Sequence, residues 1–345
     1  MDIVLACEVS ALETTLVKVA LDDTDDYSIR AIASSAIANM GSDDSRFELK
    51  PLADAGFLDD PEDRLKGVVL KALWPKHITS QALFALITPT KKRSLHGTYY
   101  YFVTDELAKS LRTEDVLPAL SWIEQNALTP EHLDYFNGTL SDAIMLKAWE
   151  EISTPEILEK FAAISYERLK VSSGRVGEQA LSEGIANNFQ EKLNAEDEAR
   201  GSLVKKLIEI IHEKDASTGK KGFILLHNPN IRLILGKDLS WLIKWLDEEE
   251  SEEIQKIVAE IIGQIFDRED VQQIELVNGA RQKNKHLADQ TNDWFTPVDL
   301  ASDLAKQERE LLEQERAWQT KREKDEKEEI LKVISPEKIT ELLEK

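Results

Sequence analysis

Apolar residues recur at helical spacing along most of the chain. The clearest stripe follows Ser251 and consists of Ile254, Ile257, Val258, Ile261, Ile262 and Ile265. These positions fall on one face of a helix with 3.6 residues per turn. Similar stripes predict helices over residues 115–125, 142–151 and 203–211. The pattern therefore predicts a mostly helical chain.

The N-terminal part contains an internal repeat. Residues 25–37 and 61–73 share one pattern, in which acidic residues are followed by a basic residue and then by small and apolar residues at helical spacing. This pattern is typical of the second helix of a HEAT-type pair, because small residues let neighbouring helices approach closely. We predict an all-α fold, namely a HEAT-like α-α superhelix (solenoid) with a charged C-terminal helix.

A pattern of capping residue, proline and glutamate marks four predicted helix starts. The first side chain can accept a bond from an orphan N–H group, proline lacks a donor that is not needed there, and the acid faces the positive helix end. The four occurrences are Asp60-Pro61-Glu62, Thr129-Pro130-Glu131, Thr154-Pro155-Glu156 and Ser335-Pro336-Glu337.

Composition divides the chain into three predicted parts. Residues 1–170 form the HEAT-like repeat region, residues 171–301 a second helical subregion, and residues 302–345 a charged helical tail with few apolar residues. Residues 223–235 contain two apolar runs around Asn228-Pro229-Asn230, which would suit a hairpin or two short buried helices. We favour the helices because the surrounding sequence is helical.

The charge balance disfavours several kinds of partner. The chain has 43 Lys and Arg against 65 Asp and Glu, a net charge of -22. Such a field repels nucleic-acid phosphates and anionic membranes. Cys7 is the single cysteine, which excludes an intramolecular disulfide and favours a reducing compartment. No apolar run approaches the ~18 residues of a membrane span. We therefore expect a cytoplasmic protein.

The sequence contains no recognisable catalytic, cofactor or metal motif. The loop at residues 218–222 has glycines and lysines but lacks the spacing of a phosphate-binding loop. The histidines are scattered, and one cysteine cannot supply a structural zinc site. Pairs of acidic residues are not evidence for general acid–base catalysis here, because acidic residues are frequent throughout the chain. We expect no catalytic, cofactor-binding or metal-binding residues, no cofactor and no enzyme activity.

The segment at residues 73–102 is the strongest candidate for a partner surface. It interrupts the repeat with prolines, a basic run and a tyrosine cluster, and aromatic and arginine side chains are enriched at interfaces. Adjacent helical residues point about 100° apart, so at least one of the three tyrosines should be accessible. The alternative is that the aromatic residues fill the core and the lysines are solvated. The candidate residues are Lys91, Lys92, Arg93, His96, Tyr99, Tyr100 and Tyr101.

Several motifs resemble a known family. Residues 59–67, 72–75, 84–89 and 97–99 resemble the HEAT-like helical region downstream of the ATPase in bacterial NACHT-type STAND proteins, and residues 238–242, 265–267 and 294–300 fit a later part of it. The resemblance implies a helical arm of a signalling ATPase, of a class that includes antiphage defence proteins. The family's phosphate-binding loop, metal-binding acid and effector domain have no counterpart here. No catalytic residue is therefore carried over, and the chain resembles a fragment, a domain or the product of a split gene.

Three functional hypotheses follow. The leading one is a non-catalytic sensor or interaction module that binds a protein, such as the ATPase core of a parent protein or a phage component. The second is a stand-alone HEAT-like adaptor that holds two proteins together. The least favoured is a helical-repeat enzyme acting on nucleic acid, such as a base-excision glycosylase, which would need a basic concave face that the net charge argues against.

Overall fold

The computed structural model describes residues 12–55, 57, 60, 62–91, 97–127, 135–171, 183–214, 223–226, 232–295, 311, 314, 316–322 and 324. Every regular element within these residues is helical, which confirms the all-α prediction. None of the described helices is both long and apolar enough to cross a membrane. The chain divides into two compact units, Met1–Leu287 and Ala288–Lys345.

The helices of the first unit follow one another with short connections. In chain order they are α2 (Glu13–Leu21), α3 (Tyr27–Met40), α4 (Asp43–Phe47), α5 (Lys50–Asp54), α6 (Arg64–Leu73), α7 (Ser80–Leu86), α8 (Thr98–Tyr101), the π-helix η2 (Phe102–Leu107), α9 (Ala108–Ser110), α10 (Thr113–Asn126), α11 (Tyr135–Trp149), α12 (Pro155–Val171), α13 (Glu183–Ala195), α14 (Asp197–Lys214), α15 (Phe223–Leu226), the 3-10 helix η3 (Gly236–Asp238), α16 (Leu239–Glu248), α17 (Glu252–Ile265) and α18 (Val271–Arg281). Helix α19 (Lys285–Phe295) begins in the first unit and continues into the second.

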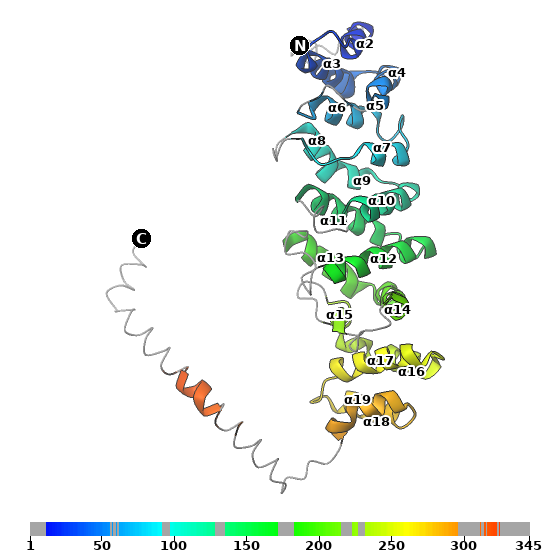
Figure 1. Cartoon of the computed structure of the whole chain (residues 1–345), viewed down its shortest axis with the longest axis vertical. Helices are drawn as coiled ribbons and strands as arrows, with labels where there is room; N and C mark the ends of the chain where they lie inside the picture. Colours follow the sequence, from blue (N-terminus) through cyan, green and yellow to red (C-terminus); the bar gives the residue numbers. More distant parts are fainter. Residues whose placement is uncertain are drawn as a thin grey trace, which may run out of the picture. The chain divides into compact units, whose positions relative to one another are not determined.

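Packing within the first unit joins helices that are close along the chain. One series of contacts runs from α3 to α6, α8, η2 and α11, and another from α7 to α10, α12, α14 and α17. Contacts between α10 and α11 and between α11 and α12 connect the two series. In Figure 1 the helices of this unit succeed one another in the order of the sequence. The buried apolar side chains lie between these helices and form a core that extends along the unit.

The predicted repeat corresponds to two helices in contact. Helices α3 and α6 contain the two matching segments, and they pack on each other. Helix α3 buries Ala31, Ala33 and Ala36. Small side chains at these positions allow the close approach that the sequence predicted.

Of the four predicted helix starts, one is confirmed and one is wrong, and the helix predicted after Ser251 is confirmed as well. Helix α12 begins at Pro155, and α17 follows Ser251, whose hydroxyl accepts a bond from the N–H of Ile254 at 3.4 Å. Helix α6 does not begin after Asp60 but at Arg64. The Asp60 carboxylate reaches forward to accept bonds from the N–H groups of Arg64 (3.0 Å) and Lys66 (2.7 Å). The patterns at residues 129–131 and 335–337 lie outside the described residues.

The apolar region at residues 223–235 is helical in its first part alone. Helix α15 covers Phe223–Leu226, whereas residues 232–235 have no helical structure, so the second predicted helix is wrong there. Residues 218–222 and 227–231 lie outside the described part of the chain. Leu233 and Ile234 are nevertheless buried. This segment therefore packs as an irregular strap.

The predicted boundary at residue 171 lies within one compact unit. The first unit runs across residue 171, and α12, which precedes the undescribed residues 172–182, packs on α14, which follows them and α13 in the sequence. In the tail, the described residues from 311 to 324 are all helical and all exposed.

Candidate functional site

The predicted partner surface separates into buried and exposed residues. Lys92, Arg93 and His96 lie outside the described residues. The Tyr99 side chain is 2 % exposed and belongs to the core, whereas Tyr101 is 50 % exposed. The prediction that at least one tyrosine is accessible is confirmed by Tyr101.

Tyr99 fixes the segment that precedes the undescribed loop. Its hydroxyl donates to the carbonyl oxygen of Thr88 at 2.7 Å and accepts from the N–H of Thr88 at 2.9 Å. Both backbone polar groups of Thr88 are therefore satisfied by one side chain. Burial raises the pKa of Tyr99 well above its ordinary value, so the phenol stays protonated.

Lys66 is buried beside Tyr99. Its Nζ donates to the Thr88 hydroxyl oxygen at 2.7 Å and lies 4.4 Å from the centroid of the Tyr99 ring. Burial lowers the pKa of Lys66 to about 8, and the charge of Asp63 partly opposes that shift. The ammonium is thus held by one hydroxyl and a ring face in a setting that disfavours its charge.

The Lys91 side chain is 45 % exposed, but it is also bonded within the protein. Its N–H donates to Asp63 Oδ2 at 2.6 Å, and its Nζ donates to the carbonyl oxygens of Asp60 (2.6 Å) and Phe57 (3.5 Å). Phe57 and Asp63 both have positive φ, at 57° and 54°. Lys91 therefore stabilises a turn with two residues in the left-handed region, which are costly there.

Gly67 sets the distance between α6 and α8. A Cβ at this position would lie 2.3 Å from the backbone nitrogen of Tyr99 and 2.5 Å from its Cα. No side chain can be placed there without separating the two helices. We call the residues that meet at this point the Lys66 cluster, namely Asp60, Asp63, Lys66, Gly67, Thr88, Lys91 and Tyr99.

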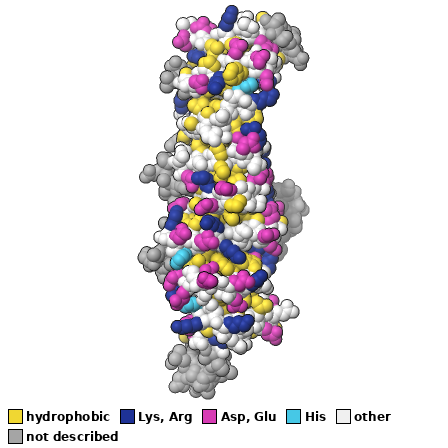
Figure 2. All heavy atoms as spheres, turned by 90° about the vertical axis from the view of Figure 1, so that its right-hand side faces the viewer, with side chains coloured by type: hydrophobic (Ala, Val, Ile, Leu, Met, Phe, Trp, Pro, Cys, Tyr) yellow, Lys and Arg dark blue, Asp and Glu magenta, His cyan; other side chains and the backbone are white. Residues whose placement is uncertain are grey.

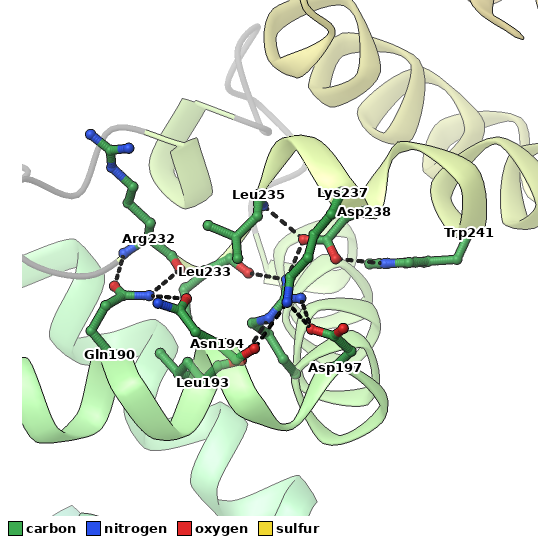
Figure 3. A network of polar contacts seen from close by, with 11 residues as sticks. Gln190, Leu193, Asn194, Asp197, Arg232, Leu233, Leu235, Lys237, Asp238 and Trp241 are labelled. Atoms are coloured by element: carbon green, nitrogen blue, oxygen red, sulfur yellow. Dashed lines mark hydrogen bonds and ion pairs between the residues drawn. The ribbon is translucent and has the colours of Figure 1, made fainter. Parts of the chain in front are cut away.

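A second polar cluster surrounds Arg200, which is fully buried at the start of α14 (Figure 3). Its Nε donates to the carbonyl oxygen of Leu193 at 2.9 Å, its Nη2 to Asp197 at 2.6 Å, and its Nη1 to the carbonyl oxygen of Leu233 at 3.4 Å and to Asp238. These bonds connect α13, α14, the irregular strap and η3. We call this set the Arg200 network.

The strap is also bonded by Gln190 of α13. The Gln190 side chain accepts from the N–H of Arg232 at 2.6 Å and donates to the carbonyl oxygen of Arg232 at 3.2 Å (Figure 3). Asp238 accepts from the N–H of Leu235 at 2.7 Å and from the indole N–H of Trp241 at 3.0 Å. Long-range side chains thus replace the hydrogen bonds that a local helix would have made.

Two tryptophans on α16 form an aromatic surface that sequence reasoning missed. The rings of Trp241 and Trp245 stack with centroids 6.3 Å apart, and Lys205 Nζ lies 5.8 Å and 5.3 Å from the two centroids. Both rings are half-buried. The sequence does contain a pattern that could have predicted this surface, because two tryptophans four residues apart lie on one face of a helix.

Asp142 and Arg168 form a buried ion pair between α11 and α12. Asp142 Oδ1 accepts from Arg168 Nη2 at 2.9 Å, and Asp142 Oδ2 has no hydrogen-bond partner. Burial raises the pKa of Asp142 to about 7, although Arg168 acts in the opposite direction. The carboxyl group therefore changes protonation near neutral pH.

Neither the described residues nor comparison with known proteins indicates a metal site or a protein family for this chain. Within the described ranges, no three His, Cys, Asp or Glu side chains gather as a metal would require. Comparison with protein-family models, with curated proteins and with solved structures found no match to this chain. The functional interpretation therefore depends on the chain's own residues.

Proposed function

We propose that this chain is a non-catalytic, cytoplasmic protein-interaction module, a HEAT-like α-solenoid that serves as the sensor arm of a NACHT-type STAND signalling ATPase of the antiphage class. The observation that carries the proposal is the double series of helix contacts in the first unit. A stack in which helices pack on their chain neighbours leaves an extended outer surface, which repeat proteins use to bind other proteins.

The Lys66 cluster supports this proposal. The motifs of residues 59–67, 84–89 and 97–99, which carry the family resemblance, contribute all its residues except Lys91. Their potentially reactive groups, the Lys66 amine and the Tyr99 phenol, are buried and bonded to Thr88. The motif thus preserves a local fold, as expected of residues shared by helical arms, and its groups are poorly placed for reaction with a substrate.

The surface chemistry also favours protein over nucleic acid as the partner. Figure 2 shows acidic, basic and apolar side chains intermixed on the face that it displays, without a continuous basic area. A phosphate backbone needs such an area, whereas a protein partner is suited by mixed charge around aromatic residues. We place the partner surface at Lys92, Arg93, His96, Tyr100 and Tyr101, and we exclude Lys91 and Tyr99 from it because they serve the fold.

The proposed partner is an acidic face of the ATPase core of the parent protein. Lys92 and Arg93 give a local positive charge in the sequence of a chain whose net charge is -22, and Tyr101 supplies an exposed aromatic side chain. Complementary charge would steer association, and the tyrosine would contribute to affinity.

Co-purification with the product of an adjoining ATPase reading frame tests the proposal. The triple variant Lys92→Glu, Arg93→Glu, Tyr101→Ala should fold normally and lose at least tenfold in affinity. Lys109→Glu is the matched control. Lys109 lies on α9, its side chain is 73 % exposed, and within the described residues its ion pair is with Asp105. A folded triple variant that binds within twofold of wild type would refute this surface.

A stand-alone adaptor is the second candidate, favoured by the aromatic surface at Trp241 and Trp245. An adaptor needs two sites, and this surface lies on different helices from Tyr101. If the Trp245→Ala variant loses one partner and the triple variant loses another, the adaptor reading replaces the sensor reading.

A further inference from the structure

The two tryptophans of α16 use their polar edges within the chain. Trp241 donates its indole N–H to Asp238 Oδ1 at 3.0 Å, and Trp245 donates its indole N–H to Glu249 Oε2 at 3.0 Å. Figure 3 shows the Trp241 ring extending away from the Arg200 network, with its N–H directed at Asp238. Both rings are half-buried, so their carbon faces and edges are what they offer to a partner.

Helix α14 brings a lysine over the same rings. Gly201 lies beside Trp241, since a Cβ at that position would be 3.8 Å from the ring. Lys205 follows one helical turn later, and its Nζ lies 5.8 Å and 5.3 Å from the ring centroids of Trp241 and Trp245. At these distances the ammonium is attracted to the ring faces and is held beside them. The aromatic surface therefore combines two indole rings with one positioned positive charge.

The charge of Lys205 is not paired within the described part of the chain. Neighbouring lysines have carboxylate partners, since Lys206 pairs with Glu209 at 3.2 Å and Lys244 of α16 pairs with Glu248 at 3.8 Å. Lys205 makes no such ion pair among the described residues, and its side chain is exposed. The unpaired charge on this surface is therefore positive, and it suits an acidic group of a partner.

We propose that the aromatic surface binds a short segment of another protein in which an acidic residue stands next to a large apolar residue. The apolar side chain packs on the rings of Trp241 and Trp245, and the carboxylate pairs with Lys205. Aromatic anchors beside a charged contact are the usual composition of a protein interface. This surface lies on other helices than Tyr101, so the proposal does not rest on the partner surface proposed there.

The surrounding charge favours a protein segment over single-stranded nucleic acid. A base stacked on tryptophan with its phosphate on a lysine would use the same two groups. However, residues 247–253, which follow the tryptophans directly, contain six acidic residues and no basic one. This run would repel the successive phosphates of a strand. A single carboxylate beside Lys205 experiences less repulsion, because Asp247 points about 200° around the helix from Trp245.

Fluorescence anisotropy with labelled peptides and the purified full chain tests the proposal. The probes are the heptapeptide Gly-Gly-Glu-Phe-Glu-Gly-Gly and its charge-reversed counterpart Gly-Gly-Lys-Phe-Lys-Gly-Gly. The glutamate peptide should bind with a Kd below about 500 µM, and the lysine peptide should bind at least tenfold more weakly. A weaker Kd for the glutamate peptide, or equal binding of the two peptides, would overturn the proposal. So would tighter binding of a labelled thymidine oligonucleotide, which would identify the occupant as nucleic acid.

Charge reversal at Lys205 tests the assigned contact. Lys205→Glu should weaken the glutamate peptide at least tenfold and strengthen the lysine peptide, whereas Trp245→Ala should weaken both. Lys283→Glu is the matched control, because Lys283 is an exposed lysine just after α18, and it should leave both affinities within twofold. A Lys205→Glu variant that is folded by circular dichroism and keeps the wild-type preference would refute the contact.

Tyr101→Ala separates this proposal from the proposed function. It should leave the affinity of both peptides unchanged, because Tyr101 belongs to α8 and the aromatic surface to α14 and α16. Peptide binding that fails in wild type refutes the aromatic surface and leaves the surface at Tyr101 standing. Peptide binding that is lost in a folded Tyr101→Ala variant would contradict the placement of the peptide on Trp241 and Trp245.

Discussion

Replacing Lys66 with methionine should stabilise the protein at neutral pH. Burial lowers the pKa of Lys66 to about 8 in the folded state, whereas a lysine in an unfolded chain titrates near ~10.4. One pKa unit corresponds to ~1.4 kcal/mol, so keeping this lysine charged costs about 3 kcal/mol. Methionine removes that cost but loses the 2.7 Å bond from Nζ to the Thr88 hydroxyl, which contributes about 1 kcal/mol. The expected net gain is about 1–2 kcal/mol.

The same shift gives a pH dependence with a definite sign. Because the folded pKa lies below the unfolded one, the unfolded chain binds more protons between about pH 8 and pH 10. The wild type therefore gains stability as pH rises through this window, while Lys66→Met has no such group. The advantage of Lys66→Met should shrink steadily between pH 7 and pH 9.5.

Urea unfolding followed by circular dichroism measures both effects. Lys71→Met is the matched control, because Lys71 is on the same helix, is 44 % exposed and pairs with Glu106 at 2.7 Å. It should change the free energy of unfolding by less than about 0.5 kcal/mol at every pH. If Lys66→Met is destabilising by more than about 1 kcal/mol, with a difference from wild type that is constant over this pH range, the reasoning is refuted.

Three further substitutions test other parts of the structure. Gly67→Ala should destabilise by about 2–4 kcal/mol in urea titration, because the new Cβ meets the Tyr99 backbone at 2.3 Å; a loss below about 1 kcal/mol would show that α6 and α8 move apart easily. Arg200→Leu should cost about 3–5 kcal/mol, since it leaves Asp238 buried without its cation, and a neutral result would show the network to be dispensable. The pKa of Asp142 is raised to about 7, so its stabilising contribution is complete below about pH 4 and is lost as pH rises through 7. Thermal melts should therefore show wild type losing stability relative to Asp142→Asn between pH 5 and pH 8, and parallel profiles would contradict this.

Helices with strong local signals were predictable from sequence. The isoleucine stripe after Ser251 and the Thr154-Pro155 start correspond to α17 and α12. In both cases the cap, the first turn and the apolar face lie within one short segment. Local propensity and tertiary packing agree there, so the sequence pattern is sufficient.

Segments held by distant side chains were not predictable. The strap at 232–235 has the composition of a short helix, but Gln190 and Arg200 bind its backbone from the preceding helices. Asp60 caps α6 from four and six residues upstream, beyond the usual capping position. Local pattern cannot report contacts of this kind.

In the candidate segment, the exposure of one tyrosine was predictable from sequence, but the long-range contacts were not. Sequence reasoning located the unusual segment and expected an exposed tyrosine, which Tyr101 is. It treated Lys91 as a surface charge, and Lys91 is exposed. It did not predict that Lys91 also bonds the carbonyl oxygens of Asp60 and Phe57 about thirty residues earlier. It also missed the π-helix η2, which directly follows the tyrosines. The groups that a lysine contacts depend on tertiary packing, which the local sequence pattern does not report.

Site-specific photo-cross-linking from position 101 tests the central claim most directly. Tyr101 would be replaced by benzoylphenylalanine in the native host, with Lys244 of α16, which is 75 % exposed, replaced as the control. The account predicts a cross-link from position 101 to a polypeptide that carries a nucleotide-binding ATPase domain, and none to that polypeptide from position 244. Absence of any ATPase adduct from position 101, or the same adducts from both positions, would contradict it.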